Sequence, residues 1–305
     1  MSTPYAPQHP APPAPYGQPP GPAPAAPGKQ PHLGHAIASE WTKIRSVRST
    51  LWTLIVMFVV VVGVSSLAGF GLSTSDHAEA PVLSPGLFGL MLGQLAVITL
   101  GVLVVTSEYS TGMIRSTMTV CPQRSRVLTA KVIVFFGLSF TMTLLACGLT
   151  ALIQAAMLEG KPLSEYTDPS QFNEETQATG HAVASGAEWL DATVGAALYV
   201  ALLGLLSLAV GTLLRSTPGA ITTMLGLVLL PFVISLFLLT EATEDIGDAL
   251  REYSTLNGLA TLYHVPFRFS FEDTSPGGWT LLGLLAAITA AALIGAYARI
   301  ATRDV

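Results

Sequence analysis

Residues 51–72 read LWTLIVMFVVVVGVSSLAGFGL, a run without a single Asp, Glu, Lys, Arg or His side chain. Five further runs share this property, at 86–106, 132–158, 193–214, 218–240 and 279–297. A helix that rises ~1.5 Å per residue crosses a ~30 Å hydrocarbon core in about 20 residues. The six runs therefore predict an all-α membrane protein with six transmembrane helices.

The basic residues between these runs collect on one side of the predicted membrane. Six crossings place 11 of the 14 on the same side: Lys29, Lys43, Arg45, Arg48, Arg115, Arg124, Arg126, Lys131, Arg215, Arg299 and Arg303. An excess of Lys and Arg marks the cytoplasmic face, which predicts that the amino and carboxyl ends are both cytoplasmic. The opposite side holds 16 of the 19 acidic residues. This agrees with the assignment, although carboxylates contribute little to orientation.

The first 50 residues divide into two segments before a membrane domain at 51–303. Residues 1–32 hold 12 of the 21 prolines and no apolar core of a signal peptide, which predicts a disordered Pro-rich cytoplasmic tail. Recognition of this tail by a partner protein is the alternative to a merely solvated tail. Residues 33–50 follow a helical period, which predicts an amphipathic helix lying in the headgroup layer.

The predicted interfacial helix has an apolar face and a charged remainder. Leu33, Ile37, Trp41, Ile44 and Val47 share the apolar face, whereas Glu40, Lys43, Arg45 and Arg48 lie largely off it. A basic flank that only orients the first span is the simpler interpretation of the same residues.

Polar and small residues within and between the spans give weaker predictions. We expect Gln94 and Gln154 to form interhelical hydrogen bonds, and Glu241–Gly278 to contain an amphipathic or re-entrant helix. Small residues recur at intervals of four in the last span, at Gly283, Ala287, Ala291 and Gly295. We expect this stripe to pack within the subunit, with a dimer seam as the alternative.

Several function classes lack the residues that they need. The spans carry no ionisable group that could bind a driving ion, and no ring of charges that could line a channel. The sequence contains no G-x-x-x-x-G-K-[ST] phosphate loop, no catalytic motif and no cysteine pair with metal-ligand spacing. A basic patch for nucleic acid is also missing. We therefore expect no enzyme activity, no cofactor and no metal in this chain, and expect any ATP hydrolysis to come from a separate subunit.

The loop after the second span predicts a docking segment. Residues 107–118 read SEYSTGMIRSTM, in which an apolar pair, Met113 and Ile114, lies beside Arg115. A short cytoplasmic helix with a contact face would explain this pattern. A positive-inside loop would explain the arginine but not Glu108 or the apolar pair.

Two stretches resemble the permease subunits of type-2 ABC exporters, a bacterial membrane family: residues 38–52 (ASEWTKIRSVRSTLW) and residues 107–117. Together with the six-span layout, the resemblance extends over about residues 34–303. The resemblance implies a dimer, with a second copy or a related permease, in the bacterial inner membrane. It also implies a separate ATP-binding subunit that holds Mg-ATP. By this likeness the ATPase-coupling contacts are Glu108, Gly112, Met113, Ile114 and Arg115, and the interfacial helix contributes Trp41, Lys43, Arg45 and Arg48.

The predicted function is therefore the permease subunit of an ATP-driven exporter. Spans without charged side chains would give the transport path an apolar lining, which favours an amphipathic or hydrophobic cargo. The proline-rich tail and the long loop 159–192 depart from the family pattern. The alternative function is a non-transporting membrane scaffold or sensor that recruits cytoplasmic partners, and dependence on nucleotide distinguishes the two.

Overall fold

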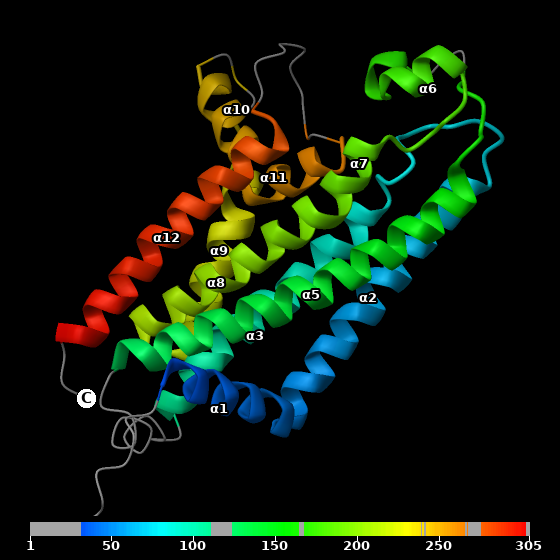
Figure 1. Cartoon of the computed structure of the whole chain (residues 1–305). Coiled ribbons are helices and arrows are strands. Elements are labelled where there is room, and N and C mark those ends of the chain that lie inside the picture. Colours follow the sequence, from blue (N-terminus) through cyan, green and yellow to red (C-terminus); the bar gives the residue numbers. More distant parts are fainter. Residues whose placement is uncertain are drawn as a thin grey trace, which may run out of the picture.

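The computed structural model describes residues 32–110, 124–164, 168–238, 240, 242–265, 267 and 276–302, and within these ranges it is helical without a β-strand. The helices are α1 (Leu33–Ser46), α2 (Arg48–Ser73), α3 (Gly86–Ser110), α5 (Arg124–Leu158), α6 (Glu174–Thr179), α7 (Gly186–Leu190), α8 (Ala196–Leu214), α9 (Thr217–Ser235), α10 (Glu244–Glu252), α11 (Thr255–Leu262) and α12 (Gly278–Thr302), with a 3₁₀ turn η1 (Pro169–Gln171) and a π turn η2 (Asp191–Gly195) (Figure 1). The predicted Pro-rich tail falls almost wholly outside these ranges.

Six of these helical stretches are long and apolar enough to cross a membrane, which confirms the predicted all-α, six-span fold. Their limits differ from those of the apolar runs. The fourth span begins at Gly186, because α7 and η2 lead directly into α8, and the fifth ends at Ser235. The third is the longest, since α5 begins at Arg124 and continues through Lys131 before its apolar part. Backbone hydrogen bonding extends a helix through polar residues, whereas an apolar run marks only the part that suits hydrocarbon.

Helix α8 lies at the centre of the bundle, in contact with α3, α5, α9 and α12. Of its most apolar stretch 72% is buried, against 17% for α9 and 22% for each of α2 and α12. Small residues allow this close packing. A β-carbon added at Gly101 of α3 would lie 2.1 Å from the hydroxyl of Ser207 and 2.4 Å from the carbonyl oxygen of Gly204. Only glycine permits the two helix backbones to approach this closely.

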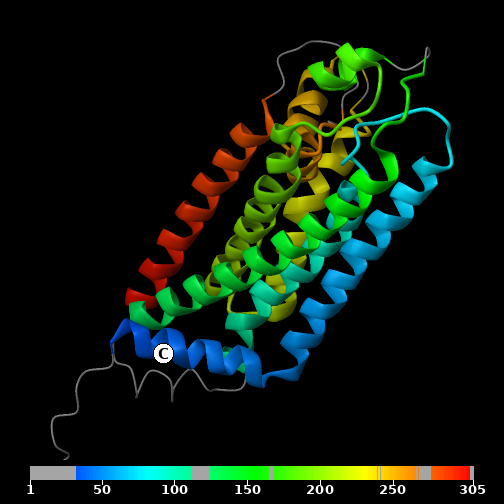
Figure 2. The same ribbon diagram turned by 45° about the vertical axis from the view of Figure 1, so that its right-hand side comes forward.

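Helix α1 lies across one end of the bundle, which we call the α1 end (Figure 2). It packs on α5 and α2, and its buried residues are Glu40 and Ile44. The structure therefore buries Glu40, although it lies off the predicted apolar face. Trp41, at 45% exposure, and Val47 from the predicted apolar face are exposed instead. Whether this exposed face lies in lipid headgroups stays a prediction.

The opposite end, which we call the loop end, carries α6, α7, α10 and α11 (Figure 1). The segment expected to hold an amphipathic or re-entrant helix contains α10 and α11. Helix α11 is the enclosed member, because Leu259 and Leu262 are buried among α8, α9 and α12. Its first turn is capped by Ser254, whose side-chain oxygen accepts a hydrogen bond from the Asn257 N–H at 3.1 Å.

Most of the small-residue stripe of α12 does not pack within the subunit. Gly283, Ala287 and Ala291 are exposed, and α12 contacts the bundle through the opposite face, where Leu281 and Leu285 are buried. The expectation of intrasubunit packing is therefore wrong for these three residues, whereas Gly295 is half-buried near Leu213 of α8. Larger apolar side chains fill the contact with α8 and α5, which leaves the small residues facing outward.

The two buried glutamines of the spans behave differently. With its amide oriented for hydrogen bonding, Gln154 of α5 donates to the Leu83 carbonyl at 3.0 Å and accepts from the Gly86 N–H at 2.8 Å. It therefore links α5 to the start of α3, as predicted. The amide of Gln94 donates to Met91 of its own helix at 3.2 Å, so no interhelical bond forms there among the described residues.

Candidate functional site

Four charged side chains from three helices meet at the α1 end. Lys131 of α5 donates to Glu40 of α1 at 2.8 Å and to Glu108 of α3 at 2.7 Å. Lys43 of α1 donates to Glu40 at 3.1 Å and also to Glu108. Each lysine therefore bridges the same two carboxylates. We call these four residues the ionic cluster.

The ionic cluster is largely withdrawn from water. Glu40 and Lys131 are each 4% exposed and Glu108 is 6% exposed, whereas the Lys43 side chain retains 31%. Two carboxylates and two ammonium groups make the cluster electrically balanced. Burying ions is costly unless they are paired and hydrogen-bonded, so removal of any one member leaves a buried, uncompensated charge.

The partners of Lys43 hold it in the charged form. Burial by itself would lower the pKa of Lys43, but hydrogen bonds and charge attraction from Glu108 and Glu40 outweigh this effect. The pKa of Lys43 therefore lies above its ordinary value. Because a raised lysine pKa favours the charged form, this contact stays intact throughout the neutral pH range.

Helix geometry explains how the cluster assembles. Glu40 and Lys43 are three residues apart and so lie on the same face of α1. Glu108 lies in the last turn of α3, directly after its apolar part, and Lys131 lies near the start of α5. The chain leaves α3 and enters α5 at the α1 end, so both residues lie beneath α1.

The structure brings Lys43 and Glu108 together, and it adds Glu40 and Lys131, which the sequence did not assign to a site. The distribution of acidic residues in the sequence could have indicated Glu40. Only three of 19 acidic residues are placed on the predicted cytoplasmic side, namely Glu40, Glu108 and Asp304. Two acids isolated among basic residues near membrane spans are candidates for buried ion pairs.

The other predicted contacts do not join the cluster. Trp41, Arg45 and Arg48 are exposed around α1 and its junction with α2. Gly112, Met113, Ile114 and Arg115 lie outside the described residues, so their role as coupling contacts stays a prediction.

The last turn of α3 is also held from its other side. The hydroxyl of Thr217 at the start of α9 donates to the hydroxyl of Thr106 at 2.8 Å. The guanidinium carbon of Arg215 lies 5.2 Å from the ring centre of Tyr109, within range for a cation–π interaction. Arg215 ends α8 in the left-handed conformation, with φ of 56°. The carboxyl end of α3, after which residues 111–123 follow, is therefore held on one side by α1 and α5. On the other side it is held by the turn between α8 and α9.

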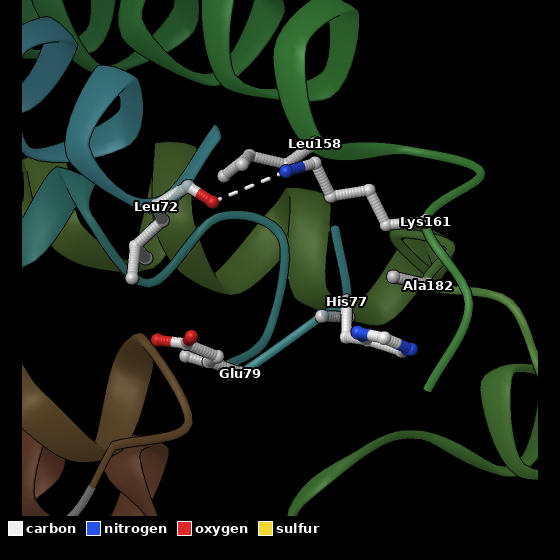
Figure 3. A pocket seen from close by; sticks show the side chains of 8 residues that line it. Leu72, His77, Glu79, Leu158, Lys161 and Ala182 are labelled. Carbon is white, nitrogen blue, oxygen red and sulfur yellow. Dashed lines mark hydrogen bonds between the residues drawn. The ribbon is translucent and has the colours of Figure 1, made fainter. Parts of the chain in front are cut away.

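A pocket at the loop end is structural. Figure 3 shows Lys161 reaching the carbonyl of Leu72, with His77 and Glu79 on the facing wall. The ammonium group donates to the carbonyls of Leu72 at 3.1 Å and Ser73 at 2.8 Å, and also to that of Ser75. A cation at these carbonyls caps the carboxyl end of α2. The three bonds use the donors of Lys161, which leaves none of them for a ligand.

Comparison with known protein families gives a match over the amino-terminal part of the chain. The family model described as "ABC-2 family transporter protein" matches residues 36–171. Over these residues the chain is similar to ABC-2 transporter proteins. No curated protein matches the chain. The region that matches the ABC-2 family contains α2, α3, α5 and all four residues of the ionic cluster.

This similarity and the six spans support a transmembrane permease of an ABC transporter. ABC-2 permeases work with an ATP-binding subunit and are typically dimeric. In this chain the ionic cluster lies at the start of the segment that the sequence predicts to contact such a subunit.

Proposed function

We propose that this chain is the permease subunit of an ATP-driven exporter and that the ionic cluster transmits force from the ATPase into the bundle. The observation that carries this proposal is the position of Glu108. It is the second residue of the predicted docking segment and is bonded to both α1 and α5. A displacement of that segment would act on α1, α3 and α5 together. Breaking a single ion pair of the cluster would leave a buried charge without its partner, which is costly.

The proposed complex contains two such permeases and two ATP-binding subunits that hold Mg-ATP. Gly112, Met113, Ile114 and Arg115 would fill a groove on the ATPase, with α1 beside them and its Trp41, Arg45 and Arg48 in the lipid headgroups. Glu108 and Lys43 would join the docking segment to the bundle. The cargo would be amphipathic or hydrophobic, because the apolar runs of the spans contain no Asp, Glu, Lys, Arg or His. We assign the direction as export on the family resemblance.

The test is nucleotide dependence. The full-length chain is reconstituted in liposomes with the ATP-binding-cassette protein that co-purifies with it, and ATP turnover is measured. We expect the permease to change the ATPase rate several-fold, and transport of the dye rhodamine 6G to require ATP and to persist when ionophores collapse the pH gradient and membrane potential. Arg115→Ala should reduce this coupling while the chain still inserts, because charge-assisted contacts to the ATPase are lost.

The same experiment decides between transporter and scaffold. If the ATPase rate is unaffected by the wild-type permease and Arg115→Ala has no effect, the chain is a scaffold or sensor. Accumulation of the dye by the permease alone under an imposed ion gradient would instead identify a secondary transporter.

We further propose that the α1 end is cytoplasmic, in a bacterial inner membrane. Ser170 of η1 and Ser125 of α5 are exposed at the loop end and at the α1 end respectively. In a Cys121→Ser background, where the remaining Cys147 is buried, Ser170→Cys should react with an impermeant maleimide added to intact cells. Ser125→Cys should react only after the cells are opened. Labelling of Ser125→Cys in intact cells would show that the α1 end faces outward and would contradict the proposed orientation.

A further inference from the structure

An apolar groove lies between the last turns of α9 and helix α10 at the loop end. Pro231 of α9 forms one wall, and the other is built from residues of α10 and its C-cap: Asp245, Ile246, Ala249, Leu250 and Tyr253. Its volume is about 460 Å³, within the range of small-molecule sites, about 300–1,000 Å³. None of the contacts described above uses this groove.

The groove opens on the membrane-facing side of the bundle. Leu227, Leu230, Val233 and Ile234 of α9 are exposed and continue the apolar surface away from the groove. Helix α10 carries four acidic residues and so cannot lie in hydrocarbon. The groove therefore lies where the hydrocarbon ends and the headgroup layer begins. An occupant there would have an apolar body and a polar head.

Charge selects the kind of head. Asp248 is paired with Arg251 at 2.5 Å, whereas Asp245, which lines the groove, has no ion-pair partner within the described ranges. Glu244 and Asp245 give the first turn of α10 a negative charge. A negative rim attracts cations and repels the phosphate of ordinary phospholipids. Tyr253 adds an exposed aromatic ring that can face a cation.

We propose that this groove binds amphiphiles with a cationic head and an apolar body. The body lies against Pro231, Ile246 and Leu250, and the head lies beside Asp245. This inference rests on the proposed function in one respect, since it names a class of cargo for the exporter. Binding itself requires neither ATP nor the ATPase.

The test uses the full-length chain in nanodiscs of zwitterionic lipid, without nucleotide. The probe is a photoreactive alkyl trimethylammonium, and the labelled peptides are identified by mass spectrometry. We expect saturable labelling of peptides from α9 and α10. An unlabelled alkyl trimethylammonium should displace the probe at a concentration at least tenfold lower than an alkyl sulfonate of the same chain length.

Two variants and one control locate the site. Asp245→Asn should weaken binding about fivefold, since a single exposed ion pair contributes about 1 kcal/mol. Ala249→Trp should abolish labelling by filling the groove. Glu175→Gln removes an equal charge from the exposed helix α6 and should change nothing. Normal gel-filtration behaviour of Asp245→Asn, an exposed position, shows that lost binding does not reflect misfolding.

Two results would overturn the proposal. Equal displacement by the sulfonate, with no effect of Asp245→Asn, would mean that the groove accepts any acyl chain. A disulfide between two copies of Ile246→Cys that the cationic amphiphile does not inhibit would mean that a second permease fills the groove. Either result leaves ATP-dependent coupling untouched, so failure here is distinct from failure of the proposed function.

Discussion

Lys131→Met should be the most damaging single substitution at the ionic cluster. It leaves two buried carboxylates, Glu40 and Glu108, to share Lys43 alone. Removing one partner from a buried charge network costs about 3–5 kcal/mol, because the remaining charge stays desolvated. We expect the melting temperature of the full-length chain in detergent, followed by fluorescence-detected gel filtration, to fall by about 10 °C.

A charge-balanced variant separates the network from simple packing. Glu40→Gln combined with Lys131→Met removes one charge of each sign and leaves the Lys43–Glu108 pair. It should melt at a higher temperature than Lys131→Met alone, although it carries one more substitution. Arg45→Met, at an exposed position of α1, is the matched control and should melt like the wild type. A wild-type melting temperature for Lys131→Met would show that the cluster does not hold α1 on the bundle.

Gly101→Ala should be among the most damaging changes within the membrane. The added methyl group would lie 2.1 Å from the Ser207 hydroxyl oxygen and 2.4 Å from the Gly204 carbonyl oxygen. Overpacking costs about 1–3 kcal/mol. We expect about 3 kcal/mol here, because the carbonyl belongs to the backbone of the central helix and cannot rotate away. The yield of folded chain and its melting temperature measure the effect.

The matched control is Gly137→Ala in α5, where an added β-carbon meets nothing within 4 Å. It should leave the melting temperature nearly unchanged. Removing the Ser207 hydroxyl as well, in Gly101→Ala with Ser207→Ala, should not restore stability, because the clash with the Gly204 carbonyl remains. Full restoration by that double variant would show that α3 and α8 are less tightly packed than the structure indicates.

The sequence by itself determined the number of spans and the fold class. A segment that enters hydrocarbon must be apolar and must satisfy its own backbone hydrogen bonds, and both requirements are local. The same local logic marked Glu108 as unusual, and residues 38–52 and 107–117 led to the resemblance to ABC-2 permeases.

Only the tertiary structure decided which faces of the helices meet. A membrane span is apolar all round, so its periodicity does not tell which side faces its neighbours. The central place of α8, the outward stripe of α12 and the Gly101 contact therefore could not be predicted. The pairing of Lys131 with Glu40 joins residues 91 positions apart in the chain. It exists because α1 folds back across the end of the bundle, where burial makes each charge require the others.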